Sequence, residues 1–236
     1  MWLSLIQLMD SAFPTGAFSH SFGLETAVQE GRVTNIGELE QWLKAYVKGS
    51  IVPMEGACVY WAYHAAERRL NEDIHDAELL QKIRELDQRV TLSKLARESR
   101  EGTVRIGKRY LHMVQSLYPD AGFDQYEQWI QKGDCYGNAA VVHGWVCAYL
   151  QLDVNSAVTS FMYTGMNSLV QNAMRTMSIW QTEGQKLLKR MHPFVTAEAS
   201  KLVANCPPPE EWFTSNILQE IDGMRHETLY SRLFMS

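Results

Sequence analysis

The sequence has few cysteines, and their spacing excludes the common cysteine-based sites. Four occur in 236 residues, at positions 58, 135, 147 and 206, and none forms the CxxC motif of zinc ribbons and thioredoxin-like centres. The start, MWLSLIQLMD, lacks the basic region that begins a secretory signal. We therefore predict reduced, mostly buried thiols in a cytoplasmic protein.

Long hydrophobic runs and an excess of positive charge are also missing. No segment reaches the roughly 18 consecutive apolar residues of a membrane-spanning helix, so we predict no membrane span. The net charge of −5 argues against a nucleic-acid-binding protein. Residues 82–109 nevertheless contain nine basic and four acidic residues, whereas the first eighty contain five and eleven. This asymmetry is consistent with steering of a charged protein partner or with an ordinary solvated face.

Strand patterns are absent, because no segment alternates apolar and polar residues between hairpin turns. Helical periodicity dominates instead. Asn35 can cap an amphipathic helix, with Glu38 completing a capping box. One face of this helix carries Leu39, Trp42, Leu43, Tyr46, Val47 and Ser50. We predict an all-α fold, a single domain over residues 1–236 built as a bundle of about eight to ten helices.

Prolines and glycines predict where the helices end. Pro53 is expected to end one helix and open the next. Residues 155–191 are too long for one typical helix, so we expect a break near Gly165 or Gly184. His192–Pro193 is expected to stop the helix that follows.

Two other segments have distinct helical compositions. Residues 93–117 carry small side chains on one side, a pattern that lets a second helix approach closely. These are Ala96, Ser99, Thr103 and Gly107. Residues 137–150 are apolar on nearly all sides, which predicts a helix buried in the core.

Catalytic and metal-binding motifs are missing. GTVRIGKR at 102–109 is one residue short of a phosphate-binding P-loop and continues a helical pattern, whereas a P-loop follows a strand. No HExxH or GxSxG occurs, and no two histidines are three or four residues apart. We predict no catalytic residue, no bound metal and no cofactor, and therefore a protein that is not an enzyme.

The segment QLMDSAFPTGAFSHSFGLE, residues 7–25, is unusual for a surface loop. Phe13, Phe18 and Phe22 are apolar anchors, while Pro14, Gly16 and Gly23 favour defined turns. Two interpretations are open: an ordered loop that plugs one end of the bundle, or a preformed docking surface with aromatic contact residues.

The C-terminal segment mixes cationic and aromatic groups, a composition typical of interface anchors. These residues are Arg225, His226, Tyr230, Arg232, Leu233 and Phe234. Terminal segments are mobile unless tied down. We expect this one to become ordered on a partner, with a frayed tail as the alternative.

The run DSAFPTGAFSHSFGLE, residues 10–25, resembles the opening signature of the urease accessory protein F (UreF) family. Residues 95–102, 172–175, 181–185 and 224–236 resemble later parts of the same family. Two positions depart from it. Ser178–Gln181 replaces a Pro-Leu-Gly-Gln run, which predicts a straighter helix here, and Asn138 lies where many relatives have a histidine nearby.

The resemblance implies an all-helical homodimer. Such proteins join the accessory proteins D (also called H) and G, bind urease apoprotein and support GTP-dependent nickel insertion, with the F-type protein bridging G to D. Residues 1–25 and 210–236 are then the expected partner-binding segments. The expected partner-binding residues are Phe13, Pro14, Gly16, Phe18, His20, Ser21, Gly23, Glu25, Arg97, Arg100, Arg175, Arg225, His226, Tyr230, Arg232, Leu233 and Phe234.

Two alternatives remain at this point. The first is a GTPase-activating protein that delivers an arginine finger to the G-type GTPase. Its candidates by residue type are Arg97, Arg100, Arg105 and Arg175. The second is a direct nickel carrier.

Overall fold

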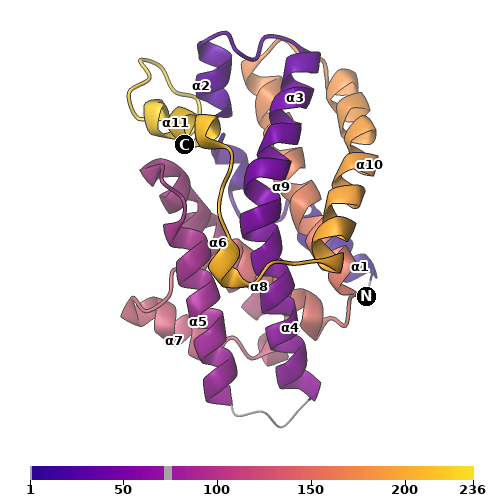
Figure 1. The fold of residues 1–236 in the computed structure, drawn as a ribbon, viewed down its shortest axis with the longest axis vertical. Helices are drawn as coiled ribbons and strands as arrows, with labels where there is room; N and C mark the ends of the chain where they lie inside the picture. The colour runs from indigo at the N-terminus through magenta and orange to yellow at the C-terminus, as the bar shows by residue number, and fades with distance from the viewer. Residues whose placement is uncertain (1, 72–75) are drawn as a thin grey trace.

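The computed structural model describes residues 2–71 and 76–236, and this part of the chain is helical, without a β-strand (Figure 1). The α-helices are α1 (Trp2–Met9), α2 (Leu24–Gln29), α3 (Ile36–Tyr46), α4 (Ala57–Asn71), α5 (Asp76–Leu92), α6 (Arg97–Leu117), α7 (Asp124–Lys132), α8 (Ala139–Tyr149), α9 (Val154–Thr176), α10 (Gln181–Ala204) and α11 (Ile217–His226). Short 3₁₀ turns are η1 (Ala17–Ser19), η3 (Pro119–Ala121) and η4 (Pro209–Glu211). The prediction of an all-α bundle is confirmed. No described helix is both long and apolar enough to cross a membrane.

Helices α3 and α4 form one continuous rod, joined by the π-helix η2 (Val47–Gly56). The expectation that Pro53 separates two helices is therefore wrong. A proline in an α-helix leaves the carbonyl four residues earlier without a donor, and here that residue is Gly49. The Gly49 carbonyl accepts instead from Ser215 N (2.9 Å) and Thr214 Oγ1 (3.2 Å). The wider π turn and these outside donors keep the rod intact.

The predicted cap of α3 is confirmed, with one difference. The Asn35 side chain accepts from the backbone N–H groups of Gly37 (3.0 Å) and Glu38 (3.1 Å). The Glu38 carboxylate reaches back one residue further than a standard capping box, to Thr34 N at 2.7 Å.

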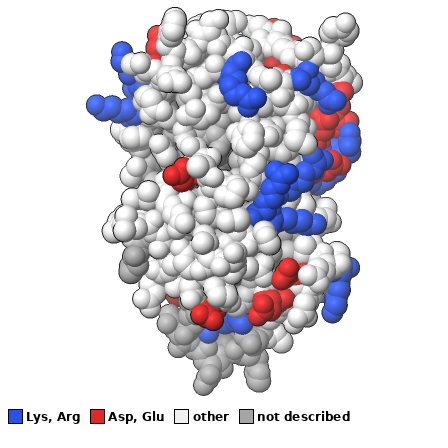
Figure 2. Space-filling view, turned by 180° about the vertical axis from the view of Figure 1, so that it is seen from behind, with Lys and Arg blue, Asp and Glu red and all other residues white. Residues whose placement is uncertain are grey.

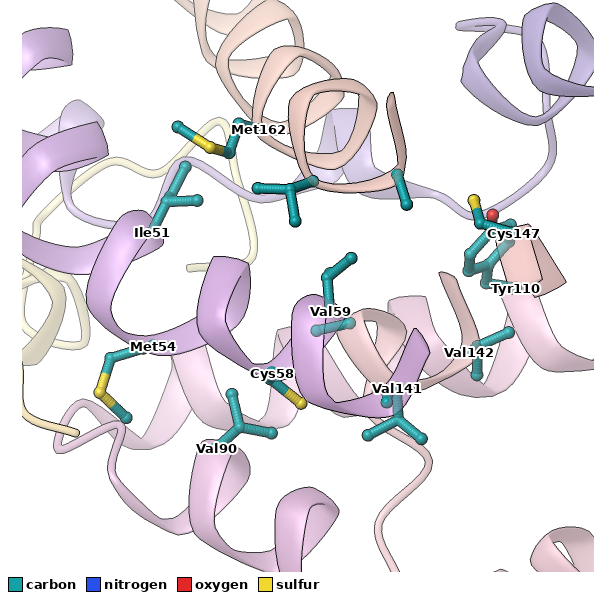
Figure 3. Packing of buried hydrophobic residues seen from close by; sticks show 14 of the residues in the cluster. Ile51, Met54, Cys58, Val59, Val90, Tyr110, Val141, Val142, Cys147 and Met162 are labelled. Atoms are coloured by element: carbon teal, nitrogen blue, oxygen red, sulfur yellow. The ribbon is translucent and has the colours of Figure 1, made fainter. Parts of the chain in front are cut away.

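Helix α8 is the centre of the core, as the apolar stretch at 137–150 predicts. Figure 3 shows Val141 and Val142 of α8 facing Cys58 and Val59 of α4. The two helices approach closely at Gly144, where a β-carbon would lie 2.4 Å from the carbonyl oxygen of Val59. The core therefore depends on a glycine as well as on bulky side chains.

The small-residue side of α6 receives other backbones, as predicted. A β-carbon on Gly223 of α11 would lie 2.8 Å from the Ala96 Cβ and 3.1 Å from Ser99 Oγ. Farther along, a β-carbon on Gly107 would collide with the Gly137 carbonyl. Helix α6 thus supports α11 at one end and the start of α8 at the other.

Helices α9 and α10 reverse direction between Met177 and Trp180 (Figure 1). Of the two predicted positions for a break, Gly165 is wrong because it lies within α9, whereas the prediction near Gly184 is confirmed because the break at 177–180 lies just before it. Gly184 lies in the first turn of α10, where a β-carbon would be 2.6 Å from Met174 Sδ, so its lack of a side chain allows the hairpin to close. The expectation of a straighter helix at 178–181 is also wrong, since the chain turns there without proline or glycine.

Pro193 does not stop α10, which continues to Ala204. The carbonyl that proline leaves without a helical donor belongs to Lys189, an exposed residue. Water can reach this side of the helix, so the missing hydrogen bond is tolerated.

Asp87 fixes the turn that precedes α8. Its buried carboxylate accepts from Tyr126 Oη (2.7 Å) and from the N–H groups of Tyr136, Gly137 and Asn138. Burial raises the pKa of this carboxyl, although these donors oppose the rise. Asn138 is fully buried, caps α8 at Ala140 N and donates to Thr91 Oγ1, so its role here is structural.

The predicted apolar stripe of α3 lies on the core, with one correction. Leu39 and Leu43 are fully buried, whereas Trp42 is only partly buried and stacks on Tyr46 with ring centroids 5.4 Å apart.

Leu43→Ala should lower the free energy of unfolding by about 3 kcal/mol. Trp42→Ala should cost less, about 1–2 kcal/mol, because water already reaches the ring. Urea unfolding of both variants measures the difference, and equal losses would contradict this placement.

Candidate partner-binding surface

The N-terminal and C-terminal segments meet on one side of the bundle. Met235 N donates to the Ser19 carbonyl (2.8 Å), while Ser21 N (2.6 Å) and Phe22 N (3.1 Å) donate to the Ser236 carbonyl. We call residues 10–25 and 217–236, with the parts of α6 and α9 that hold them, the terminal junction. The C-terminal segment is thus ordered by contacts within the chain, in contrast to the expectation that it waits for a partner.

Two glycines shape the N-terminal segment. Gly16 (φ 76°) and Gly23 (φ 91°) adopt the left-handed backbone conformation that favours glycine. A β-carbon on Gly23 would also lie 2.9 Å from the Gln219 carbonyl of α11. The turns that the sequence predicts here are therefore real, and one of them is required by contact with the C-terminal segment.

Glu25 is the main link between the two segments. Its side chain is almost fully buried and accepts from His226 Nε2 (3.0 Å), Leu233 N (2.7 Å) and Phe234 N (3.1 Å). A buried carboxylate without such donors would be strongly destabilising. One side chain of α2 therefore determines the path of the chain some two hundred residues later.

His226 joins this carboxylate to a second one on α6. Its Nδ1 lies 2.6 Å from Glu98 Oε2, and Arg232 donates to the other Glu98 oxygen at 2.8 Å. Burial alone would raise the pKa of Glu98, but the hydrogen bonds and charges of His226 and Arg232 outweigh it and lower the pKa. Glu25 and Glu98 bind opposite ring nitrogens, so the three groups cannot face one ion. In the described part of the chain, no three His, Cys, Asp or Glu side chains form a metal site.

His20 is a buried, neutral link in the same junction. Its Nδ1 lies 2.9 Å from Ser236 Oγ, and its carbonyl accepts from Asn172 Nδ2 of α9 at 2.7 Å. Burial, and then the charges of Arg105 and Arg109, lower the pKa of His20 from 6.5 to about 4. The ring is therefore uncharged at neutral pH.

Exposed arginines form hydrogen bonds and ion pairs along the surface of the terminal junction. The Arg175 guanidinium lies 4.9 Å from the centre of the Phe234 ring and donates to the Phe18 carbonyl. Arg97 pairs with Glu227 at 2.9 Å, and Arg225 pairs with Glu30 at 3.3 Å. These arginines therefore hold the two segments and are also accessible to a partner.

The structure divides the predicted partner-binding residues into two groups. The buried group is Phe13, Gly16, His20, Ser21, Gly23, Glu25, His226 and Phe234. The exposed group is Pro14, Phe18, Arg97, Arg175, Arg225, Tyr230, Arg232 and Leu233, with Arg100 partly buried. Phe13 lies apart from the surface, edge-on to the Tyr110 ring at 5.7 Å. The buried group can support a binding surface, and only the exposed group can contact a partner in this conformation.

The apolar face of α11 was not predicted from the sequence. Its exposed residues are Ile217, Leu218, Ile221 and Met224, with Phe213 just before the helix and Leu95 near it. The spacing of the first four at i, i+1, i+4 and i+7 places them on one face of a short helix, and this pattern was the available signal. Glu98 and Ser236 were not predicted either, because their roles depend on contacts between distant segments.

Basic residues of α6 lie beside this surface. Figure 2 shows Lys and Arg gathered on the side where α6 lies, next to acidic side chains. Lys108 and Arg109 are exposed, and neither forms an ion pair with a described residue. The basic stretch that the sequence predicts is therefore partly free to attract an acidic surface.

Comparisons with known proteins identify relatives of the whole chain. A family model described as UreF matches residues 33–192. The urease accessory protein UreF of Lachnoclostridium phytofermentans is 40% identical over 99% of this chain and 98% of its own length. The proteins of the same name from Bacillus sp. strain TB-90 and Streptococcus salivarius are 36% and 31% identical, over 99% and 100% of this chain and 98% and 94% of theirs.

The lowered pKa of His20 makes the junction sensitive to acid. Between pH 6.5 and about 4 the unfolded chain binds a proton that the folded chain does not, so stability is complete above pH 6.5 and falls as the pH decreases. Lowering the pH from about 7 to 5 should cost about 2 kcal/mol through this group. Urea unfolding of His20→Asn should show a pH dependence smaller by about that amount. His112→Asn, at an exposed position, should leave the dependence unchanged.

Removing the Glu25 carboxylate should release the C-terminal segment. Glu25→Ala leaves His226 and two backbone N–H groups without their acceptor, so trypsin should cleave at Arg232 at least about tenfold faster, while the far-ultraviolet circular dichroism stays helical. Glu183→Ala is the matched control, because Glu183 is exposed and its side chain pairs with no described residue. Equal cleavage rates in the two variants would show that Glu25 does not hold the segment.

Proposed function

The chain belongs to the UreF family, which supports a role in urease maturation, and we propose that within this role it is a scaffold rather than an enzyme. In this proposal the protein acts in the cytoplasm and bridges a G-type GTPase and the accessory protein D (or H). The assembly binds urease apoprotein and supports GTP-dependent nickel insertion. Nickel is then the cargo of the complex and not a resident cofactor of this chain.

The observation that carries the proposal is the construction of the terminal junction. Buried carboxylates and histidines, which in an enzyme would face a substrate, are here used to fix two chain segments. The exposed groups beside them are large and contact-prone: Tyr230 is fully exposed and Phe18 is 61% exposed. A rigid support beneath exposed aromatic and cationic groups is the usual architecture of a protein-binding hot spot.

The apolar face of α11 gives this surface a hydrophobic part. Phe213 and Ile217 are 67% and 66% exposed. Contiguous exposed apolar groups mark protein-binding surfaces more often than ordinary surface. We therefore place the D-type partner on α11 and the C-terminal segment, and the G-type partner on the basic side of α6.

A homodimer is part of the same proposal. Helix α1 exposes Trp2, Leu3 and Ile6 on one face, with Leu5 and Leu8 buried on the other. A second copy that covers this apolar face would remove it from water. The junction lies elsewhere on the chain and would stay free for other partners.

The arginine-finger alternative requires a side chain that can leave its present contacts. Arg97 and Arg105 pair with Glu101, Arg100 donates to the Lys94 carbonyl, and Arg175 donates to the Phe18 carbonyl. Each would give up a hydrogen bond within the chain to enter a GTPase site. A stimulation of GTP hydrolysis of about 10³-fold or more, lost in one Arg→Ala variant, would favour this alternative.

Deleting residues 231–236 should abolish the complex with the D-type protein. The deletion removes the hydrogen bonds of Leu233, Phe234 and Ser236 to the N-terminal segment. The residues that remain after α11 then lose the contacts that fix them beside that helix. Gel filtration of the co-expressed proteins measures complex formation. A complex recovered intact with the deleted chain would contradict the proposed role of this segment.

Two further variants distinguish a residue that holds the C-terminal segment in place from one that contacts the partner directly. Leu233→Ala changes an exposed residue, whereas Phe234→Ala changes a buried one. Faster trypsin cleavage at Arg232 is expected only for Phe234→Ala, while weaker association is expected for both. Co-purification with the D-type and G-type proteins, with and without GTP and nickel, tests the assembly as a whole.

A further inference from the structure

A partly open cavity lies beneath the N-terminal segment, between this segment and η2, α6, α8 and α9. Its volume is about 130 Å³ and its walls are mostly apolar. Ile51 of η2, Tyr110 of α6 and Phe161 of α9 contribute to these walls, and Figure 3 shows Ile51 and Tyr110 on opposite sides of the core. Apolar cavities of about this size can enclose a molecule as large as benzene.

Glu55, one of the residues that line the cavity, has a carboxylate oxygen without a hydrogen-bond partner among the described residues. Glu55 is buried, with its side chain 9% exposed, and its Oε1 pairs with Lys94 Nζ at 2.5 Å. Its Oε2 is buried and has no hydrogen-bond partner among the described residues. Such an acceptor is costly to leave unpaired, so it favours a donor inside the cavity. Because Lys94 already balances the charge, the favoured donor is a neutral one.

A second polar group faces the same space. Tyr46 lines the cavity, is 4% exposed and forms no hydrogen bond with a described residue. Its hydroxyl is close enough to Glu55 and Lys94 for their charges to act on it. Glu55 and Tyr46 thus supply an acceptor and a donor to a cavity whose walls are mostly apolar by area, a combination typical of small-molecule sites.

We propose that this cavity binds a small neutral molecule with an apolar body about the size of benzene and one hydroxyl group. The hydroxyl donates to Glu55 Oε2 and accepts from the Tyr46 hydroxyl, while the apolar body fills the space between Ile51 and Phe161. Phenol is the simplest member of this class. This site is independent of the proposed scaffold function.

The N-terminal segment forms the rim of the cavity. Thr15, Ala17 and Phe22 line it and are partly exposed. The segment is held over the opening from outside, because Arg175 donates to the Phe18 carbonyl and the Arg109 guanidinium packs against Gly16. A molecule therefore enters beneath the same segment that forms half of the terminal junction.

The test compares phenol with benzene on the purified full-length chain by isothermal titration calorimetry. A hydrogen bond to a buried carboxylate predicts that phenol binds at least about tenfold more tightly than benzene. No saturable binding of either compound would show that the cavity holds water only. Equal affinities for the two compounds would show that the hydroxyl group is not recognised by Glu55, and either result would overturn the proposal. Co-purification with accessory proteins is a separate measurement, so the two proposals can fail independently.

Three variants and one control locate the binding. Glu55→Gln replaces the free acceptor with an amide and should remove the advantage of phenol over benzene. Tyr46→Phe should reduce phenol binding several-fold and leave benzene unchanged, while Tyr163→Phe, outside the cavity, should change neither. Gly165→Ala adds a methyl group whose only close neighbour is Ile51 Cδ1 at 3.5 Å, so it fits and fills part of the space.

Gly165→Ala still tests the site if Glu55→Gln or Tyr46→Phe fails to fold. The added methyl group should weaken both compounds several-fold while the melting temperature stays at least as high as that of the natural chain. Unchanged binding in Gly165→Ala would place phenol elsewhere on the protein and refute this site.

Discussion

A buried carboxylate must find its hydrogen-bond donors inside the protein, and for Glu25 those donors lie at the other end of the chain. The ring of His226 and two backbone N–H groups of the C-terminal segment satisfy its oxygens. The cost of leaving them unpaired fixes α2, α11 and the last ten residues relative to one another. The surface proposed for the D-type partner depends on this arrangement, because it decides which side chains of the C-terminal segment point outward.

The division between buried and exposed residues changes how the UreF signature is interpreted. His20, Ser21 and Glu25 are inside, so substitutions there should weaken binding by loosening the segment. Phe18 and Tyr230 are outside, so substitutions there should weaken binding by removing contacts. The two earlier interpretations of the signature, an internal plug and a docking surface, are therefore compatible: one set of residues makes the plug and another presents the surface.

Helix ends predicted from the presence or absence of proline and glycine were wrong where a distant segment supplies the hydrogen-bond donors or the packing that the local sequence lacks. Pro53 lies inside a continuous rod because Ser215 and Thr214 satisfy the carbonyl that proline leaves free. The turn at 177–180 forms without a helix-breaking residue because α10 packs back onto α9, and Gly184 makes room for it. Proline propensity is a weak preference that tertiary contacts can override.

The sequence by itself determined the class of the fold, the cap at Asn35, the buried α8 and the small-residue side of α6, because these follow from periodicity and short-range chemistry. It also determined that residues 10–25 and the C-terminal segment are the unusual parts of the chain. Only the tertiary structure decided that these parts bind each other, that Glu98 and Asn172 hold them, and that a cavity lies beneath them. Contacts between segments far apart in the chain leave no local pattern, since each partner alone looks like an ordinary polar residue.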